Sequence, residues 1–185
     1  MKPEYERKPE MSGNLAPLTE DEAKLMAQFC RRIAANGHFI PEPAFEPLHG
    51  LVSMWAPELV IIRQPNKKGP VNILLAMYNG GAKMFTDMWH IPGGYNRWPE
   101  EDIQATCSRI AERELKIDVT YTRTIDVYKW LDGEHPYGHP LSLYVRCLPN
   151  SSIREIESLK FFPINELPEK MVEPHHRFIK NTFCL

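Results

Sequence analysis

Hydrophobic positions recur at helical spacing in the first part of the chain, between residues 25 and 33. Thr19 precedes this stretch, and Glu22 lies three residues after Thr19, which is the pattern of a capping box. Asn36-Gly37 is typical of the end of a helix. The pattern therefore predicts a helix from about 19 to 36, whose apolar stripe suits packing on the main domain or across a dimer.

Further along, short apolar runs indicate strands. The runs at 59–62 and 71–77 are separated by a turn-forming segment at 65–70, so they predict a hairpin. The other predicted elements are one or two strands over 119–131, an alternating strand over 141–147, a short strand over 159–162 and a helix over 169–183. Strands mixed with a few helices predict an α/β domain.

The chain divides in sequence into an N-terminal part and a larger domain. Residues 1–18 are polar and contain three prolines, which is typical of a loose tail, and residues 38–50 form a proline-rich connector. We therefore expect an N-terminal tail and helix over 1–45 and a catalytic domain over 46–185.

Composition narrows the class of partner. The net charge is −2 and the basic residues are spread along the chain, so we expect no nucleic-acid partner. We also expect no membrane span and no secretory signal, because no long apolar stretch occurs. The four cysteines are far apart and lack zinc spacing, which predicts reduced thiols, two of them in the core, in a cytoplasmic protein.

The segment from Trp89 to Glu101 carries the most chemical information. A short apolar stretch leads into Pro-Gly-Gly, and Pro99 is expected in the first turn of a helix that opens with Pro-Glu-Glu. Apolar residues then recur at helical spacing between 103 and 111. Paired glycines let a backbone carbonyl approach a cation or a phosphate, and helix carboxylates supply the oxygen ligands that Mg²⁺ prefers.

This segment resembles the Nudix box, G-x5-E-x7-R-E-U-x-E-E-x-G-U, in which U is apolar. Gly94, five residues and Glu100 match its first half. With one residue inserted in the seven-residue spacer, Arg109 matches the box arginine and Glu114 matches the second paired glutamate. The stretch 115–119 then matches the apolar tail.

The match departs from the box at Ile110, Arg113 and Lys116, which stand where the box has glutamate, glutamate and glycine. An ungapped register keeps Glu112 but places Ser108 at the arginine position, so we prefer the gapped register. The reduced box resembles that of GDP-mannose mannosyl hydrolases, which implies that water attacks the sugar C1 carbon rather than phosphorus.

The resemblance covers about residues 55–183. The stretch 159–168 is similar to the strand and Glu-Leu-Pro turn near the end of Nudix domains, and 174–177 resembles the Pro-His-Arg stretch that opens their last helix. The resemblance implies an α/β/α sandwich with a mixed sheet, here preceded by an N-terminal helical extension.

The resemblance also implies a metal site. Glu114 and the carbonyl of Gly93 or Gly94 are expected to bind Mg²⁺ or Mn²⁺, with phosphate oxygens and waters as the other ligands. Arg109 is expected to pair with Glu100 or Glu101 and brace the glycine loop.

Side chains near the loop are candidates for binding the substrate. Arg97 is a candidate phosphate contact, and Arg113 is a candidate replacement for the charge of a lost metal. Tyr95 is a candidate stacking residue for a base or sugar, together with the other nearby aromatic residues Trp55, Trp98 and Tyr137.

The general base stays open between two histidine pairs. His175 and His176 open the last helix, whereas His135 and His139 lie in a loop rich in glycine and proline. Histidine as a residue type titrates near neutral pH, so either pair could serve as the base. Glu173 is a third candidate.

Together these residues predict a Mg²⁺-dependent hydrolase of a nucleoside diphosphate linked to another moiety, with an NDP-sugar as the first candidate. The alternative is a catalytically inactive Nudix-fold module that binds nucleotides or regulates. The expected partner is a small nucleotide substrate, and the presence of a homodimer stays open.

Overall fold

The computed structural model describes residues 18–36, 40–41, 43–44, 48, 54–64, 69–78, 83–97, 100–131, 133–136 and 139–183. The chain forms two compact units, residues 1–40 and residues 41–185. Outside the described residues lie 1–17 of the predicted tail over 1–18, 65–68 of the predicted turn over 65–70, and Trp98, Pro99, Tyr137 and Cys184.

The first unit contains helix α1, Glu20–Ala35. The hydroxyl of Thr19 accepts a hydrogen bond from the backbone N–H of Glu22 (3.3 Å), and the Glu22 carboxylate accepts one from the N–H of Thr19 (2.8 Å). The N–H of Asn36 closes the other end on the carbonyl of Arg32. The predicted capping box and the predicted end of the helix at Asn36 are confirmed, while Gly37 lies outside the described residues.

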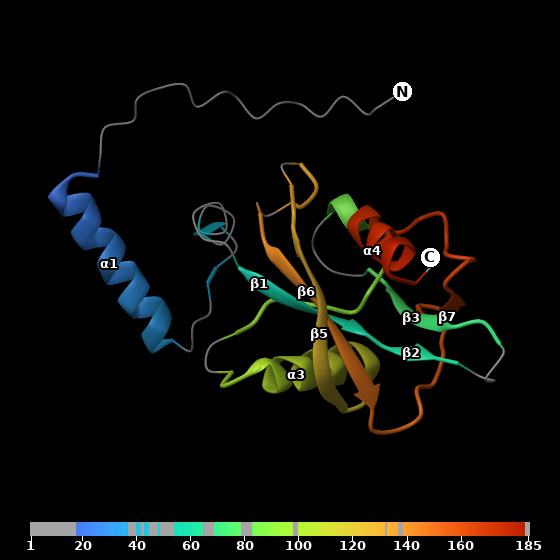
Figure 1. The fold of residues 1–185 in the computed structure, drawn as a ribbon. Helices are drawn as coiled ribbons and strands as arrows, with labels where there is room; N and C mark the ends of the chain where they lie inside the picture. The colour runs from blue at the N-terminus through green and yellow to red at the C-terminus, as the bar shows by residue number, and fades with distance from the viewer. Residues whose placement is uncertain are drawn as a thin grey trace. The chain divides into compact units, whose positions relative to one another are not determined.

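Among its described residues, the second unit contains two sheets and two helices of 13 and 11 residues (Figure 1). Its elements are β1 (Trp55–Val60), β2 (Ile62–Arg63), β3 (Asn72–Met77), η1 (Lys83–Phe85), β4 (Trp89–His90), α3 (Ile103–Leu115), β5 (Val119–Lys129), β6 (Leu141–Pro149), β7 (Leu159–Pro163) and α4 (Glu173–Phe183). One sheet has the order β1-β6-β5, with β1 parallel and β5 antiparallel to β6. The other is antiparallel, and β3 pairs with β2, β4 and β7.

The apolar run at 59–62 spans both sheets. β1 ends at Val60 and pairs with β6, whereas β2 begins at Ile62 and pairs with β3. Ile61 lies between them, and its carbonyl accepts the N–H of Leu74 on β3 (2.9 Å). The predicted hairpin therefore exists only between β2 and β3. The mixed sheet that we expected is the one formed by β1, β6 and β5, and the second sheet is antiparallel.

The strands alternate between two apolar layers. Leu59, Ile61 and Val145 pack with Ile110 and Ala111 of α3 in one core cluster. The residues between them on the strands face the other way and form a second cluster with α4, in which Val60, Ile73, Leu75, Tyr144, Phe178 and Ile179 are buried. In Figure 1, α3 and α4 lie on opposite sides of the strands. The α/β/α sandwich predicted from the sequence is confirmed.

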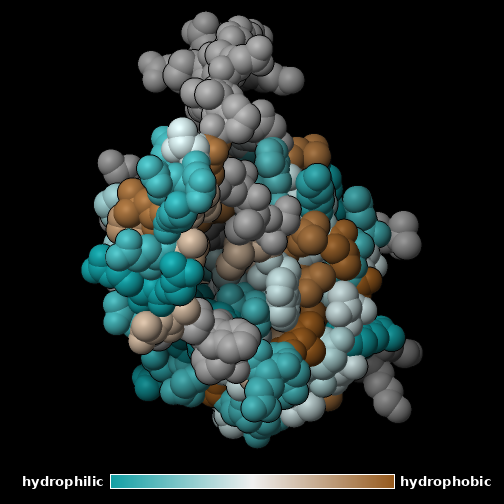
Figure 2. All heavy atoms as spheres, turned by 90° about the vertical axis from the view of Figure 1, so that its left-hand side faces the viewer, coloured by the Kyte–Doolittle hydropathy of each residue, from teal (hydrophilic) through white to brown (hydrophobic). Residues whose placement is uncertain are grey.

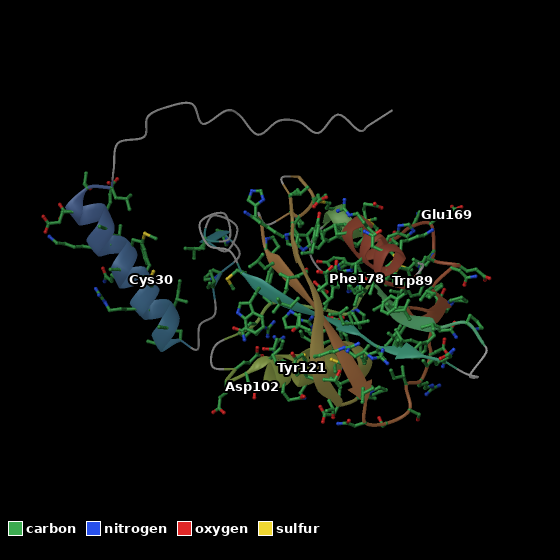
Figure 3. The ribbon with its side chains drawn as sticks, in the orientation of Figure 1. Cys30, Trp89, Asp102, Tyr121, Glu169 and Phe178 are labelled. Atoms are coloured by element: carbon green, nitrogen blue, oxygen red, sulfur yellow. The ribbon has the colours of Figure 1, made fainter. Side chains whose placement is uncertain are left out.

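Helix α3 begins later than the sequence predicted. Asp102 is its N-cap, because its backbone is extended and its carboxylate accepts the N–H of Ala105 (2.8 Å) (Figure 3). Glu100 and Glu101 therefore precede the helix, and the prediction that Pro-Glu-Glu opens it is wrong. The capping bond of Asp102 places the first helical residue at Ile103, four residues after Pro99 in the sequence.

The buried positions include Cys107 and Cys147, which confirms two core cysteines. Cys30 on α1 is exposed, and all three described thiols are free. None of the helices within the described residues has the length and hydrophobicity of a membrane span. Hydrophilic side chains predominate on the face shown in Figure 2, with smaller hydrophobic groups between them.

Lys116 directly follows α3 with φ of 56° and ψ of 34°, in the left-handed region that favours glycine. It also stands at the glycine position of the box. We predict that Lys116→Gly raises the free energy of unfolding by about 1 kcal/mol, because glycine relieves this strain. Urea unfolding measures the change. Lys116→Ala keeps the strain and should give no gain, and equal stability of the Gly and Ala variants would contradict the prediction.

Candidate functional site

The Pro-Gly-Gly loop lies directly against β1. The N–H of Leu59 donates to the carbonyl of Pro92 (2.7 Å), and the N–H of Gly94 donates to the carbonyl of Pro57 (3.2 Å). A Cβ atom at position 93 would lie 1.8 Å from Oε2 of Glu58. Only glycine therefore fits at position 93 while the Glu58 side chain keeps this position.

Arg109 joins helix α3 to the same loop. Its guanidinium pairs with the Glu100 carboxylate and donates to the carbonyl of Tyr95 (2.7 Å). The side chains of Arg109 and Glu100 are only 24% and 11% exposed. Of the two carboxylates considered as its partner, Glu100 makes the pair, whereas Glu101 is exposed.

Glu100 also collects donors from the loop and the helix. Its Oε2 accepts the hydroxyl of Thr106 (2.7 Å) and the N–H of Arg97 (2.8 Å). Burial raises the pKa of Glu100, but these hydrogen bonds and the Arg109 guanidinium outweigh burial and leave the pKa below its ordinary value. Glu100 is thus a charged anchor that ties residues 95–97 to α3.

Gly93 and Glu114 converge on one point. The same nitrogen of Arg113, Nη2, donates to the carbonyl of Gly93 (2.9 Å) and to Oε1 of Glu114. These two oxygens belong to the residues predicted as metal ligands. Gly94, whose carbonyl was the alternative predicted ligand, follows Gly93 in the loop. The N–H of Gly94 donates to the carbonyl of Pro57.

The second oxygen of Glu114 faces inward. Oε2 is buried and lies 3.8 Å from Nε2 of His90, and it has no hydrogen-bond partner among the described residues. Burial raises the pKa of Glu114, but the neighbouring His90 ring and the Arg113 guanidinium outweigh it and lower the pKa overall. Glu114 is therefore a charged carboxylate with one unused oxygen. Glu112, which the ungapped register favours, is exposed.

These oxygens fit a divalent cation. Among the described residues no group of three or more His, Cys, Asp and Glu side chains could hold a metal ion. Mg²⁺, however, is usually bound by one or two carboxylates, with substrate phosphates and waters completing its shell. The carbonyl of Gly93 and the carboxylate of Glu114 supply such a partial set.

Glu58 brings a second carboxylate to this region from β1. It is 6% exposed, and its Oε1 accepts the hydroxyl of Ser142 (2.9 Å), which in turn accepts the indole N–H of Trp130 (2.8 Å). Burial raises the pKa of Glu58 well above its ordinary value, and the negative charge of Glu114 adds to this rise.

The two predicted histidines at the start of α4 have different surroundings. His175 is buried, its Nδ1 accepts the N–H of Ile91 (3.0 Å), and its Nε2 lies 3.8 Å from Oε1 of Glu58. Burial lowers the pKa of His175 well below its ordinary value, so the ring is neutral. His176 is partly exposed and lies 4.0 Å from the exposed Glu173, so it does not share the surroundings of Glu58.

The remaining predicted residues lie around the loop. The hydroxyl of Tyr95 is 3.4 Å from Nε2 of His135, whose ring packs against Trp130. His139 is exposed and contacts the carbonyl of Trp130. The side chain of Arg97 is exposed. The structure thus places Tyr95 and His135 together and leaves Arg97 accessible.

Sequence reasoning did not identify Glu58, His90 or Ser142. Glu58 had a usable signal, because it directly precedes an apolar run and shares a strand face with Val60. A carboxylate on the buried face of a strand needs a partner, which marks it as a candidate site residue. His90 and Ser142 had no comparable signal in sequence, since only the fold brings them to Glu114 and Glu58.

No protein-family model matches the sequence, and no curated protein is similar to it in sequence. Similarity is found among solved structures. A MutT NUDIX hydrolase from Burkholderia pseudomallei aligns with a TM-score of 0.55 and 18% identity over 71% of this chain and 98% of that one. A NUDIX hydrolase from Nitrosomonas europaea aligns with a TM-score of 0.51 and 20% identity over 68% and 81%.

A third similar structure contains a ligand. The NUDIX domain of Shewanella oneidensis NrtR, crystallised with ADP ribose, aligns with a TM-score of 0.52 and 14% identity over 81% of this chain and 94% of that one. The chain therefore has the fold of the Nudix hydrolases. This confirms the fold implied by the Gly94, Glu100, Arg109 and Glu114 pattern.

The brace between Arg109 and Glu100 gives a stability prediction. In a double-mutant cycle with Arg109→Gln and Glu100→Gln, we expect a coupling energy of about 1–2 kcal/mol, because the pair is largely buried and anchors the loop. Urea unfolding of the four proteins measures it. The exposed pair of Arg63 and Glu155 is the control, with side chains 47% and 36% exposed, and should couple by less than about 1 kcal/mol. Equal coupling in the two cycles would refute the brace.

Proposed function

We propose that this chain hydrolyses a nucleoside diphosphate linked to another group, with an NDP-sugar as the first candidate substrate. The observation that carries the proposal is the convergence of the Gly93 carbonyl and the Glu114 carboxylate at one point of a Nudix fold. There they would hold Mg²⁺ or Mn²⁺, which would neutralise the diphosphate and stabilise charge on the leaving group.

The roles of the other residues follow from their contacts. Arg109 and Glu100 position the loop, so that Gly94 and Tyr95 present a fixed surface to the substrate. The exposed Arg97 is the proposed phosphate contact. The ADP ribose in the NrtR structure supports the substrate class, because it is a nucleoside diphosphate linked to a sugar.

His175 serves as a positioning residue in this proposal. Because its Nδ1 accepts the N–H of Ile91, the neutral ring carries its proton on Nε2, which faces Glu58. It therefore cannot take a proton at Nε2. The Glu58 carboxylate, beside Gly93, is the proposed acceptor for the proton of the attacking water. No proton transfer is assigned to His176, because His176 lies near the exposed Glu173 and not near Glu58.

The second candidate is a binding or regulatory module without turnover. Arg113 and Ile110 stand where the box has acidic residues, which favours this alternative. Shewanella oneidensis NrtR has also been crystallised with a 27mer DNA, although this chain covers only 59% of that one. Nucleotide binding that is independent of divalent cations and gives no product would support the module.

We predict that a screen of NDP-sugars, dinucleotides and NTPs with Mg²⁺ or Mn²⁺ reveals turnover that Glu114→Gln lowers by about 10²–10³-fold. This is the usual cost of losing one group that stabilises developing charge. Mass spectrometry of the products measures it, and circular dichroism checks folding. Glu112→Gln on the same helix is the control and should keep full turnover. A fully active Glu114→Gln enzyme would remove Glu114 from the site.

We further predict attack at the sugar carbon. With Ile110 and Arg113 in the box, helix α3 offers fewer carboxylates to gather the cations that activate water at phosphorus. The similarity of the reduced box to that of GDP-mannose mannosyl hydrolases supports the same outcome. Hydrolysis in ¹⁸O-labelled water, followed by mass spectrometry, should place the label in the free sugar. Label in a phosphate product would rule this out.

A further inference from the structure

We infer that Arg113 is a built-in cation of this site, which competes with a divalent cation for the Gly93 carbonyl and the Glu114 carboxylate. The inference rests on the cation site of the proposed function. It adds a residue that the Nudix pattern does not assign, since the box has an acidic residue where this chain has Arg113.

The position of the guanidinium is the first argument. Nη2 of Arg113 donates to the carbonyl of Gly93 (2.9 Å) and, at the same time, to Oε1 of Glu114. A Cβ atom at position 94 would lie 3.0 Å from this nitrogen and 3.7 Å from the central guanidinium carbon. The guanidinium therefore lies against the glycine backbone, at the point where the two proposed ligands meet.

The contact between Arg113 and Glu114 also differs from an ordinary helix-surface pair. Adjacent residues on a helix point in different directions, so their side chains do not meet without bending toward a common target. Here the common target is the carbonyl of Gly93, on a loop twenty residues earlier in the chain. Glu114 is only 18% exposed at its side chain, whereas Arg113 is 45% exposed. Arg113 therefore reaches inward from the surface to neutralise a mostly buried carboxylate.

A metal ion and this guanidinium cannot share the site. Mg²⁺ needs its oxygen ligands at about 2.0–2.1 Å, and a second positive charge at hydrogen-bond distance opposes it. Entry of the cation therefore requires Arg113 to leave both oxygens. The diphosphate of a substrate offers the displaced guanidinium a bidentate partner. Cation and nucleotide would thus enter together, and the cation alone would bind weakly.

The test measures binding of Mn²⁺ alone, by electron paramagnetic resonance of the free ion, without any nucleotide. We expect Arg113→Gln to bind Mn²⁺ about tenfold more tightly than the wild-type chain, because it removes both the competing donor and the like charge. Arg154→Gln is the matched control. It removes the same charge from an exposed loop position and should leave the affinity unchanged. Thermal melts of each variant check that the fold is intact.

The double variant Arg113→Gln with Glu114→Gln separates the two proposals. Loss of the gained affinity in the double variant supports the inference. If Arg113→Gln and the wild-type chain bind Mn²⁺ equally well, Arg113 does not compete, and the inference is wrong while the cation site stands. If Arg113→Gln binds no Mn²⁺ at all, Gly93 and Glu114 form no cation site, and the cation in the proposed function fails together with the inference.

Discussion

The close approach of the Gly93 backbone to Glu58 sets the geometry of the whole region. A side chain at position 93 would collide with the Glu58 carboxylate. Because glycine has none, the loop can follow β1 and exchange backbone hydrogen bonds with it. The carbonyl of Gly93 is thereby held where Arg113 of α3 donates both to it and to the neighbouring Glu114 carboxylate. The strand contributes Glu58, the loop contributes the Gly93 carbonyl, and helix α3 contributes both Arg113 and Glu114.

Around this contact, burial separates the roles of the two carboxylates. The His90 ring and the Arg113 guanidinium keep the pKa of Glu114 low, whereas burial raises the pKa of Glu58, which has a hydroxyl and a neutral imidazole beside it. Environments that push the pKa values of two acids apart are typical of sites in which the acids do different work. Glu114 is suited to bind a cation, and Glu58 is suited to exchange a proton.

Much of the fold could be predicted from the sequence because its signals are local. The capping pair of Thr19 and Glu22 and the stripe of α3 depend only on residues a few positions apart, and both were found. The break in the strand at Ile61 could not be predicted, since it depends on which partner each half pairs with. The start of α3 was predicted too early because the prediction relied on Pro99 and overlooked Asp102, whose carboxylate caps the helix.

The site was predictable only where a motif fixed the spacing. Gly93, Arg109 and Glu114 followed from the box, but Glu58 and Ser142 come from strands far apart in sequence. Their hydrogen bond joins residues 84 positions apart, as does the bond between Ile91 and His175. Forming contacts of such long range costs the conformational entropy of closing large loops before the contacts add stability. We therefore expect the buried half of the site to form in the late, non-local steps of folding, and the parallel pairing of β1 with β6 to slow its assembly.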